Sequence, residues 1–187
     1  LLLTGALGWL GITQMSSIND QSTVITKNWL PSIDTIHRMN TLTAEVRTQQ
    51  YSNVLAQTPE GKKRAQGNYE AANEKLDQRE KEYEKLISSP EERAVYDEYL
   101  VEVKAYDADS ARIFELSSAG QNAEAEQALI ESREDFYALQ DTLTELVAMN
   151  VQGGDAASLE GDAIFDSART MFMVLIAIAL AIGVGAA

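Results

Sequence analysis

The sequence predicts an all-α protein: an antiparallel up-down-up-down four-helix bundle flanked by two truncated transmembrane helices. Three observations support this fold class. Two prolines mark helix starts, apolar residues recur at steps of three and four, and both ends of the 187-residue chain are apolar and uncharged. Apolar residues at this spacing form one face of a helix, whereas strict alternation would indicate strands. Short breaks between such helices place neighbours antiparallel.

The two ends of the chain predict membrane helices. Residues 1–12 read LLLTGALGWLGI and residues 171–187 read MFMVLIAIALAIGVGAA, and neither stretch contains a charged residue. A helix needs about 20 apolar residues to cross a bilayer. We expect residues 1–12 to be the end of one transmembrane helix and residues 171–187 the start of another. A remnant of a cleaved signal peptide is the alternative for the first stretch.

Two prolines and one glycine predict where the inner helices begin and end. Pro59 and Pro90 each follow a capping hydroxyl, Thr58 or Ser89, and each precedes a glutamate. This order is typical of a helix N-terminus. Gly120 lies among polar turn formers and predicts a break between two helices. The expected sensor domain is 13–170, with helices at about 14–57, 59–88, 90–118 and 122–170.

The fourth expected helix has the clearest apolar line, of the kind that packs at a shallow angle in a bundle. It passes Gly153 and Gly154, which weaken a helix by up to about 1 kcal/mol each, but an apolar face resumes at Ile164. We therefore expect one helix that can bend. In the first helix, Pro31 predicts a kink or a late start, because proline removes an internal hydrogen bond. The apolar line of the fourth helix comprises Leu129, Ser132, Phe136, Leu139, Leu143, Leu146 and Asn150.

Composition removes several classes of function. The net charge of -14 disfavours nucleic acid as a partner, and the absence of cysteine excludes disulfides and thiolate metal sites. The single histidine has no metal-ligand spacing around it. No nucleophile and base pair and no glycine-rich phosphate loop is apparent. We expect a protein that is not an enzyme and that has no cofactor.

Three stretches carry a resemblance to a known family. They are the opening LLLTGALGWLGI, the run IDTIHRMNTLTAEVRTQQYSNVLAQT in the first helix, and ESREDFYALQDTLTELVAMN in the fourth, which leads through glycine-containing sequence to the second apolar end. Together they resemble the four-helix-bundle ligand-binding region of methyl-accepting chemotaxis proteins. The resemblance implies a homodimer in the bacterial inner (cell) membrane, a bundle in the periplasm and a cytoplasmic signalling part beyond residue 187.

A polar interruption in the first helix predicts a ligand site. The apolar line through Ile33 and Ile36 continues into Asn40, Thr43 and Arg47. A water-soluble ligand needs such hydrogen-bonding groups in a partly desolvated cleft. Arginine suits a carboxylate, because its planar guanidinium binds two oxygens and stays charged.

The resemblance adds partners to this site. In aspartate and serine receptors of the family, arginines of the first helix meet polar and aromatic groups of the fourth helix across the dimer interface. Arg38 and Arg47 resemble the outer two of that arginine set, although Thr43 stands between them. On the fourth helix, Arg133, Tyr137 and Gln140 share a face. The predicted ligand-binding residues are Arg38, Asn40, Thr43, Arg47, Arg133, Tyr137 and Gln140.

Structural explanations compete with these assignments. Arg38 and Arg133 can be surface groups paired with nearby carboxylates. A competing apolar line, through Leu42 and Val46, would turn Arg47 outward. Tyr137 can belong to the bundle core.

We therefore expect the sensor region of a bacterial transmembrane chemoreceptor that recognises a small anionic ligand, an organic acid or amino acid, and transmits a helix displacement across the membrane. The expected partners are such a carboxylate, the lipid bilayer at both ends and a second subunit, with no nucleic acid. Two alternatives remain open: the sensor region of a transmembrane histidine kinase, and a structural or adaptor bundle without a ligand, in which the polar interruption only sets the register.

Overall fold

The computed structural model describes residues 2–185, with side-chain surroundings for residue 5 and residues 8–181. Within these residues the chain is helical and has no strand. It divides into two compact units: residues 31–150, which we call the bundle, and a second unit made of the residues before and after them, which we call the helical pair. The elements are α1 (Leu2–Val24), a π-helical turn η1 (Ile25–Trp29), α2 (Leu30–Leu55), α3 (Pro59–Tyr83), α4 (Pro90–Ser118), α5 (Asn122–Glu131) and α6 (Arg133–Gly185).

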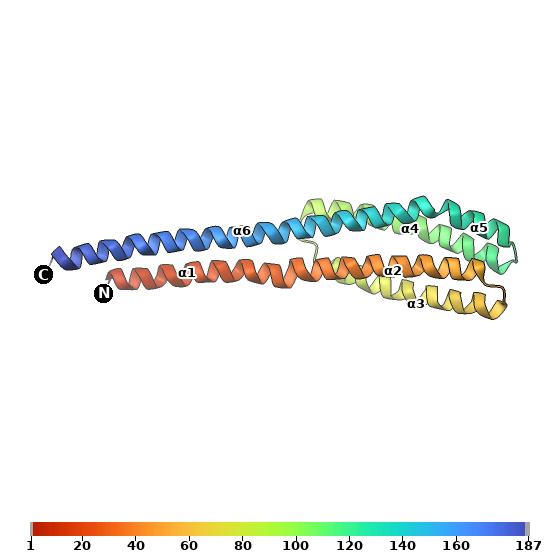
Figure 1. Ribbon diagram of the computed structural model, residues 1–187, viewed down its shortest axis with the longest axis horizontal. Helices are drawn as coiled ribbons and strands as arrows, with labels where there is room; N and C mark the ends of the chain where they lie inside the picture. Colours follow the sequence, from red (N-terminus) through yellow and green to blue (C-terminus); the bar gives the residue numbers. More distant parts are fainter. Residues whose placement is uncertain (1, 186–187) are drawn as a thin grey trace. The chain divides into compact units, whose positions relative to one another are not determined.

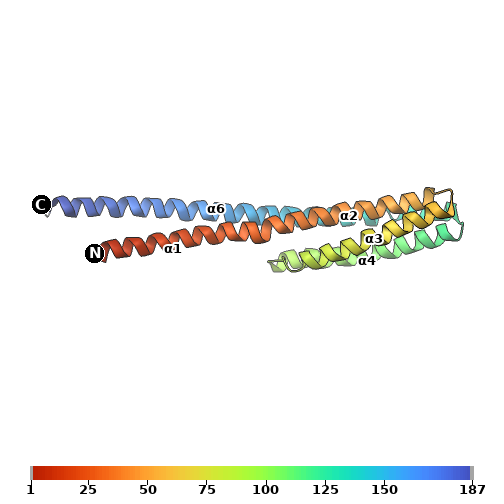
Figure 2. The same ribbon diagram turned by 90° about the horizontal axis from the view of Figure 1, so that it is seen from below.

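The bundle consists of α2, α3, α4 and a fourth rod formed by α5 and the start of α6. Both views in Figures 1 and 2 show the α2–α3 and α4–α5 turns together at one end of the bundle and the α3–α4 turn at the other. We call the end with the α2–α3 and α4–α5 turns the two-turn end. The predicted antiparallel four-helix bundle is confirmed.

The predicted helix boundaries have the expected local chemistry. Pro59 and Pro90 begin their helices; the Thr58 hydroxyl accepts from the Gly61 N–H at 3.1 Å, and the Ser89 hydroxyl accepts from the N–H two residues after Pro90 at 3.0 Å. Each cap satisfies one of the N–H groups that a helix start leaves without a partner. Gly120 follows α4 with φ of +78°, a left-handed conformation that only glycine adopts at little cost.

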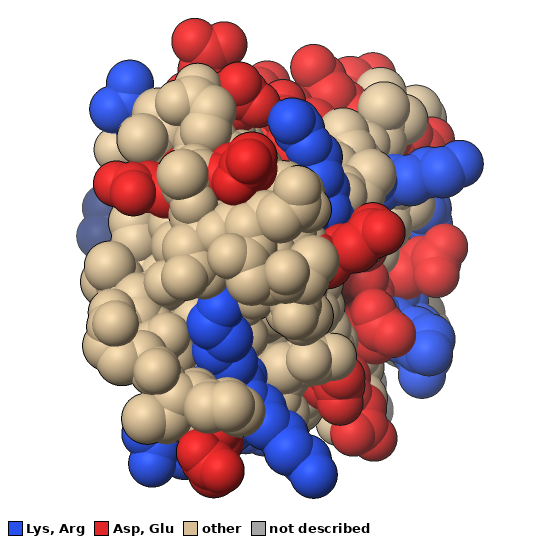
Figure 3. Space-filling model, turned by 90° about the vertical axis from the view of Figure 1, so that its right-hand side faces the viewer, with Lys and Arg blue, Asp and Glu red and all other residues tan. Residues whose placement is uncertain are grey.

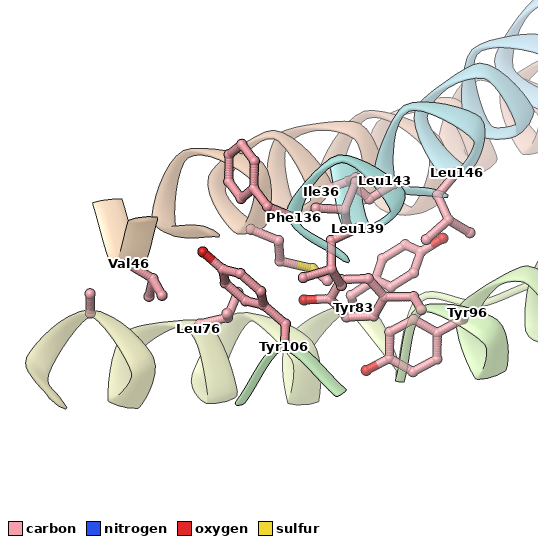
Figure 4. Packing of buried hydrophobic residues seen from close by; sticks show 13 residues of the cluster. Ile36, Val46, Leu76, Tyr83, Tyr96, Tyr106, Phe136, Leu139, Leu143 and Leu146 are labelled. Atoms are coloured by element: carbon pink, nitrogen blue, oxygen red, sulfur yellow. The ribbon is translucent and has the colours of Figure 1, made fainter. Parts of the chain in front are cut away.

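The main core of the bundle lies between all its rods (Figure 4). It contains Phe136, Leu139, Leu143 and Leu146 of the apolar line predicted for the fourth helix, and the three leucines are almost completely buried. Burying a leucine side chain contributes about 1.5–3 kcal/mol, so these residues hold α6 against the other helices. The aromatic residues Tyr83, Tyr96, Tyr99 and Tyr106 are buried in the same cluster. A second, smaller core cluster lies nearer the two-turn end and comprises Val54, Ile113, Ala125, Ala128 and Leu129.

The structure differs from the sequence prediction at two breaks. The fourth rod is divided at Ser132, which separates α5 from α6. The second helix ends at Tyr83 rather than near residue 88, and a turn closed by the Leu86 N–H and the Tyr83 carbonyl at 2.8 Å follows it. Polar groups from other helices stabilise both breaks. Such contacts between helices cannot be read from the sequence of one helix.

Pro31 is the second residue of α2, which begins at Leu30. The π-helical turn Ile25–Trp29 precedes it, and the Leu30 N–H donates to the carbonyl of Ile25, five residues earlier. A π-turn inserts one extra residue and so changes which carbonyls need a donor. Proline has no N–H to donate within a helix, and the π-helical turn lies directly before α2, which continues to Leu55.

The helical pair consists of α1 with η1 and the part of α6 from Val151 onward. Its arms touch at Gly153, where an added Cβ would lie 2.5 Å from a ring carbon of Trp29. One helical stretch of the described residues, within Asn122–Ala181, is long and apolar enough to cross a membrane, and few residues of its apolar window are buried. Residue 1 and residues 186–187 of the two expected spans lie outside the described residues.

Candidate ligand-binding site

Arg47 lies inside the bundle, with 5% of its surface exposed. Its Nη2 donates to the carbonyl oxygen of Leu129 at 2.7 Å, and its Nη1 donates to the Ser132 hydroxyl at 2.7 Å. Leu129 lies in the last turn of α5, where carbonyls lose their partners within the helix. The guanidinium of Arg47, on α2, therefore bridges the break between α5 and α6.

A buried hydrogen-bond network extends from this guanidinium to α4. Gln50 accepts from Arg47 at 3.1 Å and from the Tyr106 hydroxyl at 2.9 Å, and its amide donates to Ser110 at 2.7 Å. Burial raises the pKa of Tyr106 to about 12, although the nearby Arg47 acts in the opposite direction. We call Arg47, Gln50, Tyr106, Ser110 and Ser132 the Arg47 network; it joins α2, α4 and the α5–α6 break.

The charge of Arg47 is not balanced by a carboxylate. None of the ion pairs of the described residues includes it, and its hydrogen-bond acceptors are neutral. The rings of Tyr51 and Phe136 lie 5.0 and 5.5 Å from its guanidinium carbon and supply cation–π attraction. A buried cation without an anionic partner is costly, and this makes Arg47 a candidate for a negatively charged ligand.

Two other predicted site residues are exposed. Arg38 pairs with Asp34 on the same helix, with 2.7 Å between Nε and the carboxylate, and both side chains are more than half exposed. The hydrogen bond from Arg38 lowers the pKa of Asp34. Arg133, the first residue of α6, is also exposed. These positions are on the bundle surface, apart from the Arg47 network.

The remaining predicted residues belong to α2 and α6, and two of them meet. The Gln140 amide donates to the Asn40 side chain at 3.3 Å, which joins the two helices. Thr43 is buried and donates to the carbonyl of Met39 at 3.0 Å, within its own helix. Tyr137 is 54% exposed, so it is a surface residue. The structure therefore brings Asn40 together with Gln140 and leaves Tyr137 available to a partner.

Sequence reasoning missed a second buried polar cluster, centred on Glu92. This carboxylate is 2% exposed and accepts from Tyr83 at 2.8 Å, from Asn150 at 2.9 Å and from the Ser88 N–H at 2.8 Å. We call these four residues the Glu92 cluster; it joins the α3–α4 turn to α6. Burial, with the Glu92 carboxylate as acceptor, raises the pKa of Tyr83. The one available signal was Asn150, a polar residue on the apolar line of the fourth helix.

The fold and these networks define a class: a helical bundle with polar groups inside it and, among the described residues, no cluster of histidine, cysteine or acidic residues that could hold a metal ion. The family described as a four helix bundle sensory module for signal transduction matches residues 1–165. The chain belongs to this family of sensory modules of membrane chemoreceptors. The family is one of signalling modules rather than of catalysts.

A similar curated protein is "Putative sensory transducer protein YvaQ" of Bacillus subtilis (strain 168). The two sequences are 24% identical over 189 residues, which covers 98% of this chain and 32% of that protein. The chain thus spans about a third of the length of this relative.

Proposed function

We propose that this chain is the ligand-binding sensor region of a bacterial transmembrane chemoreceptor, anchored in the inner membrane through both ends with its bundle in the periplasm. Its ligand is a small anion such as a carboxylate. The observation that carries this proposal is the buried guanidinium of Arg47, which has only neutral acceptors. A carboxylate offers it the charged, two-oxygen partner that the protein lacks.

Anion binding at Arg47 would act on the start of α6. The guanidinium donates to Leu129 and Ser132, on the two sides of the α5–α6 break. A carboxylate that takes over one of these donors changes the hydrogen bonding of the break and favours another position of α6. Since α6 is one helix from Arg133 to Gly185, its displacement is the signal we propose. The ligand must bind one of the two positions more tightly than the other.

A second subunit is part of this proposal. Four large apolar or aromatic side chains of α2 and the fourth rod are exposed by 44 to 69%. A dimer interface that covers such side chains is a common arrangement in symmetric oligomers. The four residues are Tyr51, Leu55, Ile130 and Tyr137.

Calorimetric titration of the chain in lipid nanodiscs with a panel of dicarboxylates and amino acids tests the proposal. We expect at least one saturable binder, lost in Arg47→Ala and retained in Arg112→Ala, because Arg112 is exposed and paired with Glu131 at 3.1 Å. Folded wild-type protein that binds nothing in the panel would contradict the anion-sensor function. Loss of stability without any change in binding would favour a ligand-free bundle.

A further inference from the structure

A hollow lies at the two-turn end of the bundle, away from the Arg47 network. It encloses about 450 Å³ between the α2–α3 turn and the α4–α5 turn. Most of the residues that line it are polar, and they include Lys62 and Lys63 of α3, together with Ser117, Ser118 and Asn122. Figure 3 faces this end of the bundle and shows Lys and Arg side chains that cross uncharged residues, with Asp and Glu side chains around them.

The ammonium group of Lys62 is oriented by neutral oxygens. It donates to the Ser117 carbonyl at 2.6 Å and to the Asn122 side chain at 2.7 Å. An ammonium has three N–H donors, so one remains after these two bonds. The contacts hold the charge in place without neutralising it.

The neighbouring cations are also without carboxylate partners. Among the described residues, no ion pair includes Lys62, Lys63 or Arg64, although the chain as a whole carries a net charge of -14. Arg64 lines an adjoining hollow on the other side of the α2–α3 turn. In an acidic protein, such a group creates a local positive potential that attracts anions.

A buried polar atom points to the same place. The hydroxyl of Ser117 has no hydrogen-bond partner in the described structure, and only 1% of the residue is exposed. Ser117 lines the hollow beside Lys62. Buried hydroxyls are nearly always paired, so the Ser117 hydroxyl is a donor that an oxygen-bearing ligand in the hollow would satisfy.

We propose that this hollow is a second anion-binding site, for a small oxyanion with two or more negative charges. Lys63 and the third N–H of Lys62 would bind the charged oxygens, and the Ser117 hydroxyl would donate to one of them. The charge preference follows from two ammonium groups in one wall. The site is independent of Arg47, because its residues come from α3, α4 and α5 and not from the Arg47 network.

The structural role of Lys62 requires a careful choice of variants. Its bond to Ser117 also satisfies a carbonyl in the last turn of α4, so replacing Lys62 can loosen the turn as well as remove charge. Lys63 has no such bond and is exposed. Lys63→Ala is therefore the main test, with Lys104→Ala as a matched control, since Lys104 is exposed on α4 and does not line the hollow.

The experiment is calorimetric titration of the full chain in nanodiscs with inorganic phosphate and with citrate. We expect saturable binding that Lys63→Ala weakens at least fivefold, that Lys104→Ala leaves within twofold, and that Arg47→Ala preserves. Binding of either probe that is unchanged in Lys63→Ala, or absent in folded wild-type protein, overturns the second site. Binding of an acidic peptide in place of both small anions would also overturn it. Loss in Arg47→Ala alone would assign the anion to the first site.

Discussion

The guanidinium of Arg47 donates at 2.7 Å to the carbonyl oxygen of Leu129, 82 residues later in the chain. This bond joins a side chain of α2 to the end of α5. It helps to explain how a helix break can lie inside the bundle, because the carbonyl at the break accepts from Arg47 of a neighbouring helix as well as from the Ser132 hydroxyl. The same arginine is thus both a structural group and the best-placed cation for a ligand.

Replacing Arg47 with Ala should destabilise the bundle. The change removes one of two donors from the Leu129 carbonyl and from the Gln50 amide oxygen, and it removes the donor to the Ser132 hydroxyl. These buried losses cost about 2–4 kcal/mol in total. Chemical unfolding followed by circular dichroism at 222 nm measures the effect. The control, Arg112→Ala, removes an exposed ion pair and should change the free energy of unfolding by less than about 1 kcal/mol. Equal effects of the two variants would refute the structural role of Arg47.

Glu92→Ala should also destabilise the bundle, by about 2–4 kcal/mol, because Tyr83 and Asn150 lose a shared buried acceptor. Glu91 is an exposed acid in the same first helical turn, so Glu91→Ala is the matched control and should cost less than about 1 kcal/mol. Both variants can be compared by thermal unfolding. A Glu92→Ala protein as stable as the control would show that the cluster contributes nothing.

Asp109 of α4 predicts how stability depends on pH. Burial, together with its hydrogen bond to Asp135 and repulsion from it, raises the pKa of Asp109 above its usual value of 3.8. Between pH 3.8 and the raised pKa of Asp109, the folded protein therefore binds more protons than the unfolded chain. The free energy of unfolding falls as pH rises through that interval. Asp109→Asn should raise the melting temperature at pH 7, and its advantage over the parent chain should shrink as pH falls towards 3.8. An equal advantage at both pH values would exclude this explanation.

Gly153→Ala tests the contact between the arms of the helical pair. Alanine normally stabilises a helix by about 1 kcal/mol over glycine, but the added Cβ would lie 2.5–2.7 Å from three ring carbons of Trp29. We expect a net loss of about 1–2 kcal/mol and a shift in Trp29 fluorescence in a Trp9→Phe background. Gly67→Ala is the control, because nothing lies within 4 Å of its added Cβ, and it should be stabilising. A stabilising effect at both positions would contradict the packing.

Much of the fold could be predicted from local chemistry. The capped prolines Pro59 and Pro90 begin helices, Gly120 follows one, and the apolar line of the fourth helix is the core line. Each of these signals depends on residues within one or two turns, so no knowledge of the partner helices is needed. The surface pairing of Arg38 with Asp34 is local in the same way, since the two residues are four apart on one helix.

The candidate site depended on the tertiary structure. Arg47 turns inward because Leu129 and Ser132 accept its hydrogen bonds from another rod, and Glu92 is buried because Tyr83 and Asn150 donate to it from two other helices. Periodicity shows which face of a helix is apolar, but the burial of a charged side chain is decided by whether distant groups satisfy its hydrogen bonds. Local sequence was thus sufficient for the helices and their shared core, whereas the packing of the four rods decided which polar residues lie inside.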